Sequence, residues 1–447
     1  MRRAFALVLA VILLAACTKA PTQQETATTT TPSTEQPPAA PTSSQPSSLT
    51  TIRVLTLSDD PVMDALISAY QAKYPTDRIQ KVRAQRGSRE ITIPDLVKEM
   101  VQKGEMDLLT VYNTPTLVQE GLLLPLDPLL QQAGVDLSAY GDGLDALRYE
   151  GKLYQLPYSL SPNLVLYNPQ LFADAGVDLP KAGWTWEQFR ETAQKLTKGE
   201  GQGKTWGVAL DFPDSFLSHY LNGRGSGQAE GFANEALMKE ALGLISTLVQ
   251  TDGSMVKVER WSNGEPPSLT GNGLFRDGRA AMTIDSFTTI AFDREMEGAW
   301  KIKLAAAPMP VQPVDKPVAG ATGQSISIAA NAQNVEAAWR FARFVGGPDG
   351  AEILARMGRL PLYNTPEVKK AWAEQPGGPL PGTEFLLETT WYLIPQTWPS
   401  ISPGWTNLFA TVRDVQNAVM SGAESWEDGF ARYKVALQQY QSEQKGE

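Results

Sequence analysis

The order of strand-like and helix-like segments between residues 52 and 112 is the strongest constraint that this sequence places on its fold. Residues 52–57 alternate in a way that predicts a strand, and apolar residues at helical spacing follow it. The same order then repeats, with a strand predicted near 79–84, a helix over 96–101 that ends at Gly104, and a strand over 107–112. Such alternation indicates a wound α/β domain with a mostly parallel sheet.

The beginning of the chain has the pattern of an export signal. Arg2 and Arg3 give a positive start, and residues 4–14 form an apolar run that is too short for a permanent membrane-spanning helix. The stretch Leu14-Ala15-Ala16-Cys17 resembles a bacterial lipobox, in which the cysteine receives a lipid and the preceding peptide is removed. We therefore expect residues 1–16 to be a signal peptide and lipidated Cys17 to anchor the protein to the outer face of the cell membrane. An ordinary secretory signal with an incidental cysteine is the alternative.

The segment after this signal has the composition of a linker. Residues 18–50 are almost entirely Thr, Ser, Pro, Ala, Gln and Glu. Such a segment cannot bury enough apolar surface to offset the loss of chain entropy, so we predict a disordered linker over residues 17–50. Cys17 is the one cysteine of the sequence, which excludes a disulfide framework, a CxxC redox pair and a cysteine-based zinc site in the folded residues 51–447.

Size and charge narrow the function classes. About 400 residues remain for folding, which exceeds one typical domain and predicts two. Removal of Arg2 and Arg3 leaves 37 basic residues of the original 39 against 49 acidic residues, so the net charge is near −12. This charge disfavours nucleic acids and anionic membrane surfaces as partners.

The residues that could support catalysis do not form a recognisable active site. His219 is the one histidine, and nothing near it marks a nucleophile, so we interpret it as a structural or surface residue. Residues 198–205 resemble a phosphate loop only superficially, because Lys198 stands where the first glycine belongs. Asp214 and Asp285 could serve a glycosidase only at a separation that the sequence does not give. No metal-binding motif appears, so we expect neither an enzyme nor a cofactor or metal.

A resemblance to a known family is distributed over residues 52–440. Its blocks are Met106-Asp-Leu-Leu109, Glu120-Gly-Leu-Leu-Leu-Pro-Leu-Asp127, Gly151-Lys-Leu-Tyr-Gln-Leu-Pro-Tyr158, Trp184-Thr-Trp-Glu187, Phe275-Arg-Asp-Gly-Arg-Ala-Ala-Met282 and Glu336-Ala-Ala-Trp339. Six such blocks in the right order resemble the family 1 extracellular solute-binding proteins of ABC sugar importers, which include the maltodextrin-binding proteins.

This resemblance implies an α/β fold of the two-lobe, periplasmic-binding-protein-like type II, in which each lobe is a mixed sheet flanked by helices. Lobe 1 would comprise about 52–156 and 305–347, and lobe 2 about 160–300 and 350–447. The chain would cross between the lobes near Tyr158, Leu304 and Gly346. Closure about these crossings is a hinge motion that a ligand drives only if it binds the closed form better.

The resemblance also implies a ligand site in the interlobe cleft. The candidate residues that would hydrogen-bond ligand hydroxyls are Asp59, Asp60, Asn113, Asp214 and Asp285. Further candidates at the cleft are Thr114, Tyr158, Ser161, Asn163, Ser286, Gly323 and Gln324. The candidate aromatic residues that could stack on a sugar ring are Tyr112, Phe212, Phe216, Phe287 and Trp405. The maltodextrin binders carry a carboxylate near Ser161, so the serine leaves the identity of the ligand open. Helix capping is the alternative role of Asp60, and core packing is that of Phe216.

We therefore expect a monomeric protein that captures a carbohydrate, most simply an oligosaccharide, and delivers it to the permease of an ABC transporter. One alternative is the same fold with a non-sugar solute, such as a polyol phosphate or a cation. A second alternative is a surface enzyme that degrades polysaccharides. An adaptor that senses the ligand for a signalling partner would share the same binding chemistry.

Overall fold

The computed structural model describes residues 49–56, 60–85, 93–110, 114–210, 215–224, 226, 228–257, 271–288, 301–311, 320–389, 392–393 and 403–446. The predicted alternation of strands and helices is confirmed at the start of this chain. Its first elements are β1 (Thr50–Thr56), α1 (Pro61–Lys73), β2 (Asp77–Arg83), α2 (Ile93–Gln102), β3 (Leu108–Leu109), α3 (Thr114–Gln119) and α4 (Asp127–Gln132). β1 lies between β2 and β3 and is parallel to both. This arrangement is the wound α/β unit that the sequence predicts.

The middle of the described chain contains its longest strand and several helices. Its elements are η1 (Ser138–Leu147), β4 (Arg148–Tyr149), β5 (Lys152–Leu153), β6 (Leu156–Tyr167), α5 (Pro169–Ala175), α6 (Trp186–Leu196), η2 (Gly201–Gly203), β7 (Trp206–Val208), α7 (Ser215–Gly223), α8 (Gln228–Phe232), α9 (Glu235–Ser246), the π-helical η3 (Thr247–Thr251), α10 (Gly271–Arg276) and β8 (Ala280–Ser286). The helix α6 begins with a capping box in which Thr185 and Gln188 bond reciprocally, as their spacing predicts.

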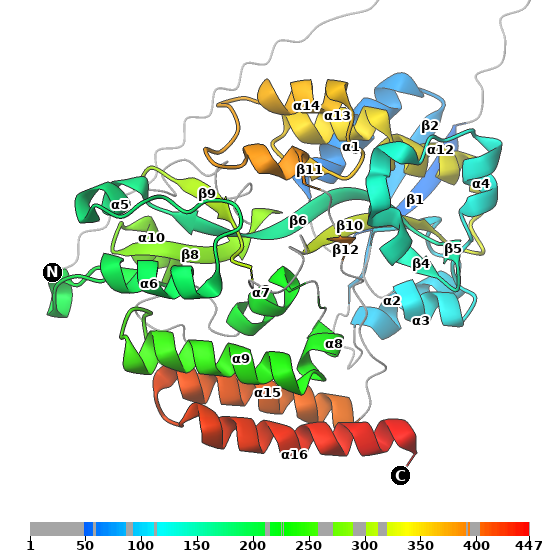
Figure 1. The fold of residues 1–447 in the computed structure, drawn as a ribbon. Coiled ribbons are helices and arrows are strands. Elements are labelled where there is room, and N and C mark those ends of the chain that lie inside the picture. The colour runs from blue at the N-terminus through cyan, green and yellow to red at the C-terminus, as the bar shows by residue number, and fades with distance from the viewer. Residues whose placement is uncertain are drawn as a thin grey trace, which may run out of the picture. The chain divides into compact units, whose positions relative to one another are not determined.

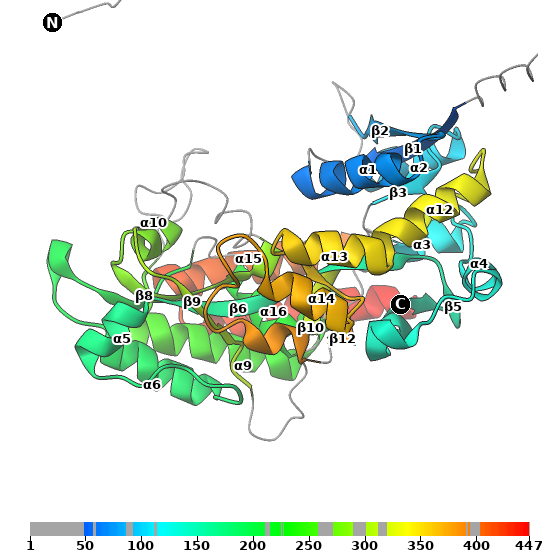
Figure 2. The same ribbon diagram turned by 90° about the horizontal axis from the view of Figure 1, so that it is seen from above.

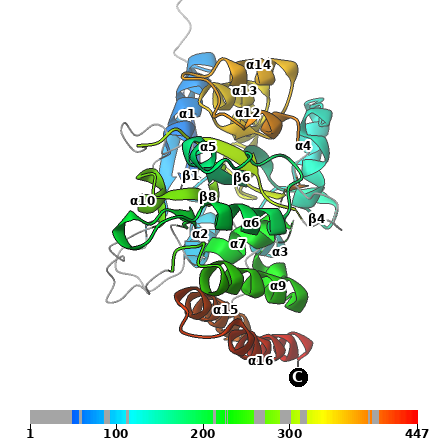
Figure 3. The same ribbon diagram turned by 60° about the vertical axis from the view of Figure 1, so that its left-hand side comes forward.

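The last part of the chain returns to the first sheet and then ends in helices. Its elements are β9 (Ala305–Pro308), β10 (Gly320–Ile328), α12 (Val335–Gly346), α13 (Pro348–Arg356), β11 (Leu360–Pro361), α14 (Pro366–Ala373), η4 (Glu384–Leu387), β12 (Tyr392–Leu393), α15 (Pro403–Ser421) and α16 (Trp426–Lys445). Figure 3 shows that α9, α15 and α16 lie together beyond α7, in agreement with their mutual contacts.

The sheet runs without interruption through both halves of the fold. One half contains β2, β1, β3 and β10, the other contains β8 and β7, and β6 joins them. The strand order is β2-β1-β3-β10-β6-β8-β7, with β9 and β11 also paired to β6 and β12 paired to β10. The order is mixed, because β10 is antiparallel to β3 and β6, whereas β7 is parallel to β8. Figure 1 shows β6 as the long strand that joins the two halves.

Among the residues that the structure describes, three apolar clusters cover the sheet. The first core lies on one face along its whole length and includes Leu66 of α1, Phe341 of α12, Leu354 of α13, Trp372 of α14, Phe275 of α10, and Leu160, Leu164 and Leu166 of β6. On the opposite face, the second core packs α6, α7, α9, α15 and α16 against residues such as Val165 and Tyr167 of β6. The third core packs α2 and α3 against Leu55 of β1 and Leu109 of β3.

The helices α13 and α14 belong to the first core. They follow α12 directly, and Figure 2 shows them over the middle of β6, which α13 contacts. The ring of Trp372 in α14 lies 5.6 Å from that of Phe287, which follows β8. This packing joins residues of 350–447 both to β6 and to the end of β8. The lobe boundaries near residues 156, 160, 305 and 347 stay a prediction.

Candidate functional site

The strand β6 changes partners in its middle. Residues 156–162 pair with β10, whereas residues 163–167 pair with β8 on one side and β9 on the other. The change falls at Pro162, which has no backbone N–H and suits a position where one ladder ends. We call this point the crossing, and it lies close to the crossing predicted at Tyr158.

A polar strip lies on one face of the sheet at the crossing. Alternate residues of a strand face the same side, and paired residues of neighbouring strands share a face. Ser161 pairs with Thr322, Ser159 pairs with Gln324, and Asn163 pairs with Ser286. The polar strip therefore consists of Ser159, Ser161, Asn163, Ser286, Thr322 and Gln324.

The polar strip separates two apolar regions. Val165 and Tyr167 continue the same face of β6 into the second core, and Leu109 of β3 belongs to the third core. Hydroxyl and amide groups between two apolar clusters have no packing function of their own, and each costs free energy if it is buried without a partner. Such groups can donate hydrogen bonds to an uncharged polar ligand and accept hydrogen bonds from it.

Ser161 connects the three strands at the crossing. Its hydroxyl oxygen accepts a hydrogen bond from the backbone N–H of Thr288 at 3.2 Å, just beyond β8. Its carbonyl oxygen accepts a hydrogen bond from the Thr322 hydroxyl at 3.1 Å, from β10. The Ser161 hydroxyl still carries its own proton as a donor, so this residue can fix the crossing and contact a ligand together.

Four of the predicted site residues form part of the polar strip, namely Ser161, Asn163, Ser286 and Gln324. Gly323 pairs with Leu160, and Asp285 pairs with Leu164, so both point to the face of the first core. The Asp285 carboxylate accepts the backbone N–H of Ser286 at 2.6 Å. The sequence reading missed Ser159 and Thr322, although the period-two spacing of Ser159, Ser161 and Asn163 would have indicated Ser159.

The predicted stacking residues that the structure describes, and the further candidate Tyr158, are buried in apolar cores. Phe216 is 0% exposed and packs against Trp186 with ring centroids 6.0 Å apart. Trp405 lies inside α15, stacked on Phe232 with ring centroids 6.4 Å apart. Tyr158 and Phe287 belong to the first core. These four rings offer little surface to a ligand in this conformation, because neighbouring side chains cover them.

The remaining predicted residues are at helix starts or outside the described residues. Asp60 caps α1, since its carboxylate accepts the backbone N–H of Val62 at 3.0 Å, which confirms the predicted capping role. Thr114 is the first residue of α3. The residues that lie outside the described part of the chain are Cys17, Asp59, Tyr112, Asn113, Phe212 and Asp214.

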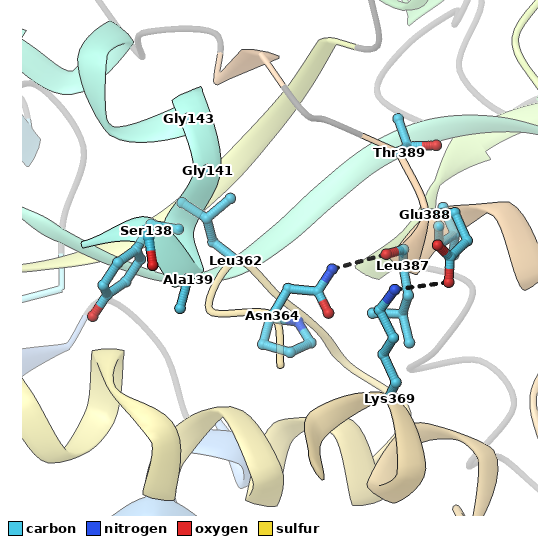
Figure 4. A pocket seen from close by; sticks show the side chains of 13 residues that line it. Ser138, Ala139, Gly141, Gly143, Leu362, Asn364, Lys369, Leu387, Glu388 and Thr389 are labelled. Carbon is cyan, nitrogen blue, oxygen red and sulfur yellow. Dashed lines mark hydrogen bonds and ion pairs between the residues drawn. The ribbon is translucent and has the colours of Figure 1, made fainter. Parts of the chain in front are cut away.

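A separate pocket of about 230 Å³ lies between η1, the β11–α14 turn and η4. Figure 4 shows Asn364 at its centre, where the side-chain amide donates to the carbonyl of Leu387 at 2.8 Å. The Lys369 ammonium donates to the Glu388 carboxylate at 2.8 Å at the same pocket. Leu362, Leu386 and Leu387 of its lining belong to the first core, so the pocket lies on the face opposite the polar strip.

Neither a metal centre nor a membrane-spanning helix is found in the part of the chain that the structure describes. No group of three or more His, Cys, Asp or Glu side chains in these residues could hold a metal ion. No helix among them combines the length and apolar character needed to cross a bilayer.

Comparison with known proteins gives a consistent set of relatives. The mannitol-binding protein of Pseudomonas aeruginosa is 26% identical over 348 residues, which cover 70% of this chain and 72% of that protein. A solved structure of a sugar transporter from Rhizobium etli, in an open conformation, is 25% identical, has a TM-score of 0.70 and covers 87% of this chain and 99% of that chain. An ABC substrate-binding protein from Listeria monocytogenes in complex with cycloalternan is 18% identical, with a TM-score of 0.65, and covers 89% of this chain and 99% of that chain.

The fold agrees with these relatives. The mixed sheet with flanking helices and the likeness to these structures confirm the predicted two-lobe, periplasmic-binding-protein-like type II fold. A family model described as bacterial extracellular solute-binding protein matches residues 60–352, which is more than half of the sequence. The chain therefore belongs to the bacterial extracellular solute-binding protein family.

Proposed function

We propose that this protein captures a neutral carbohydrate outside the cell and delivers it to the permease of an ABC transporter. The observation that carries the proposal is the polar strip, which interrupts the apolar cover of one sheet face at the crossing of β6. The ligand would bind there, in a cleft between the two lobes, and most simply would be an oligosaccharide.

The chemistry of the polar strip suits a hydroxylated ligand. Its hydroxyl and amide side chains can each donate and accept hydrogen bonds, as sugar hydroxyls also do. None of its six members carries a charge, so the polar strip supplies no counter-ion for a phosphate or an ammonium group. The relatives support this ligand class, because they include a mannitol-binding protein and a protein solved with cycloalternan.

The position of the polar strip gives the ligand a means of closing the protein. β6 is the strand that both halves of the sheet share, so a rotation at the crossing would change the angle between them. A ligand that contacts both halves binds the closed form better and therefore shifts the population towards it. The permease would then distinguish the loaded from the empty protein by its closed form.

Titration calorimetry against mannitol, monosaccharides and α- and β-linked di- and trisaccharides tests this proposal. We expect binding to at least one of them, and Gln324→Ala should weaken it about tenfold, the effect of one lost hydrogen bond of about 1.4 kcal/mol. Gln131→Ala, at an exposed position of α4, is the matched control and should leave the affinity unchanged. Failure of every carbohydrate to bind, together with tight binding of glycerol phosphate or a polyamine, would overturn the proposal.

The anchor belongs to the same proposal. Lipidated Cys17 and the linker that follows it would keep the binding protein close to the permease while leaving it able to reorient. Cells that express the protein should incorporate labelled palmitate into it, and Cys17→Ser should abolish the label and release the protein from the membrane fraction. Equal labelling of the wild type and Cys17→Ser would exclude this anchor.

A further inference from the structure

His219 is the one histidine of the sequence, and it lies in the middle of α7. The second core takes up Phe216, Leu217, Tyr220 and Leu221 of the same helix. Successive residues of an α-helix are about 100° apart, so His219 is on the side away from Leu217 and Leu221. It is about 60° from Phe216, so the imidazole lies at the edge of the helix face that packs into the second core.

The helix α7 lies at the crossing. It contacts β6, β8 and β10, the three strands that carry the polar strip. Figure 1 shows α7 beside the middle of β6. The helix packs with Val165 and Tyr167 of β6, which share the sheet face of the polar strip, so the residues of α7 lie beside the polar strip.

One atom of the His219 ring is buried, although the residue as a whole is partly exposed. This atom is Nδ1, which has no hydrogen-bond partner among the described residues. Burial lowers the pKa of the imidazole to about 4, so the ring is neutral at physiological pH. A residue that is partly exposed although one of its ring atoms is buried fits a concave site.

We propose that His219 determines ligand specificity at the polar strip by hydrogen-bonding a ligand hydroxyl through Nε2. This inference rests on the proposed function. It adds His219 to the proposed site and names a ligand hydroxyl as the group that His219 would recognise. A neutral imidazole suits an uncharged hydroxyl, because it donates from one nitrogen without requiring a counter-charge.

The tautomer follows from the same geometry. A buried N–H without a partner is rarer in proteins than a buried acceptor without one. The proton of the neutral ring is therefore on Nε2, where it can donate to the oxygen of a ligand hydroxyl. The Nδ1 atom then remains an acceptor.

Nitrogen-15 NMR of the protein labelled at histidine tests this directly, because the sequence has one histidine. The protein must carry a purification tag without histidine. Long-range ¹H–¹⁵N spectra should show the Nε2–H tautomer, and a saturating amount of a carbohydrate that binds in calorimetry should shift the Nε2 resonance by more than the Nδ1 resonance. Unchanged resonances at saturation would overturn the proposal.

Variants separate this contact from a structural role. His219→Ala should weaken the affinity about tenfold, whereas His219→Gln, whose amide can occupy the place of Nε2, should stay within about threefold of the wild type. Tyr220→Phe removes a hydroxyl that donates to Glu240 of α9, and it should leave the affinity unchanged. Equal affinity of the wild type and a folded His219→Ala would exclude the proposal. If no carbohydrate binds the wild type at all, it is the proposed function that fails.

Discussion

Replacing Asp107 with alanine should lower the free energy of unfolding by about 3–5 kcal/mol, the usual cost of removing one partner of a buried ion pair. The Asp107 side chain is 2% exposed and lies just before β3. Its carboxylate accepts hydrogen bonds from the backbone N–H of Arg53 at 2.8 Å, from the Arg53 guanidinium at 2.8 Å and 3.0 Å, and from the backbone N–H of Gln333 at 2.9 Å. The variant leaves these donors, and the charge of Arg53, without their acceptor.

Urea denaturation followed by circular dichroism measures this loss. Asp349→Ala is the matched control, because the Asp349 carboxylate pairs with Lys73 at an exposed site, with 42% of its side chain accessible. Exposed ion pairs contribute about 0–1 kcal/mol, so the control should shift the midpoint little. If the two variants lose similar amounts of unfolding free energy, the buried Asp107 carboxylate stabilises the protein no more than an exposed one does.

The contribution of Asp107 to the free energy of unfolding should also depend on pH. Burial alone would raise the pKa of the Asp107 carboxyl, but hydrogen bonds from the Arg53 side chain and from the Arg53 and Gln333 amides, with the Arg53 charge, hold this pKa below its usual value. A carboxyl with a lowered pKa in the folded state stabilises the protein above its unfolded pKa, and this stability is lost as the pH falls through the folded pKa. The wild type should therefore lose its advantage over Asp107→Ala below about pH 4.

Replacing Gly382 with alanine should lower the free energy of unfolding by about 3 kcal/mol or more, through left-handed strain and overpacking together. Gly382 has φ +82°, and an added Cβ would lie 2.1 Å from the carbonyl oxygen of Ala306 in β9. The adjacent Pro381 carbonyl accepts the backbone N–H of Ala306 at 2.9 Å. The backbone around Gly382 must therefore move away from β9 to admit a methyl group.

Gly377→Ala is the control for this variant. Gly377 has φ +77°, but nothing lies within 4 Å of an added Cβ, so only the backbone strain of about 1 kcal/mol should appear. Thermal denaturation of both variants separates the two effects. If Gly382→Ala is no less stable than Gly377→Ala, the close approach to Ala306 does not contribute to the loss of stability.

Local signals in the sequence predicted the starts of helices well. The capping role of Asp60 before Pro61 and the capping box of Thr185 and Gln188 depend only on neighbouring residues, and the structure confirms both. Long-range pairing, by contrast, decides how β6 is built. Pro162 falls where this strand changes partners and needs no backbone donor, so the strand continues through it.

Long-range packing limited what could be inferred about the site. Trp405 is one of the predicted stacking residues, but it lies inside α15, and Phe232 and Tyr440 from distant segments pack against its ring. Thr322 joins the polar strip because of its register with Ser161, which no local pattern encodes. A histidine without charged or metal-binding neighbours in the sequence likewise gives no sign of the three strands beside it.

The pairing of β3 with β10 has a consequence for the order in which the chain can fold. Leu109 pairs with Ser327, which is 218 positions later. The first half of the sheet therefore stays unfinished until nearly three quarters of the polypeptide has been synthesised. Contacts of such long sequence separation form slowly. For most of its synthesis the chain therefore lacks the strand that links β3 to β6, so we expect this sheet to be completed late.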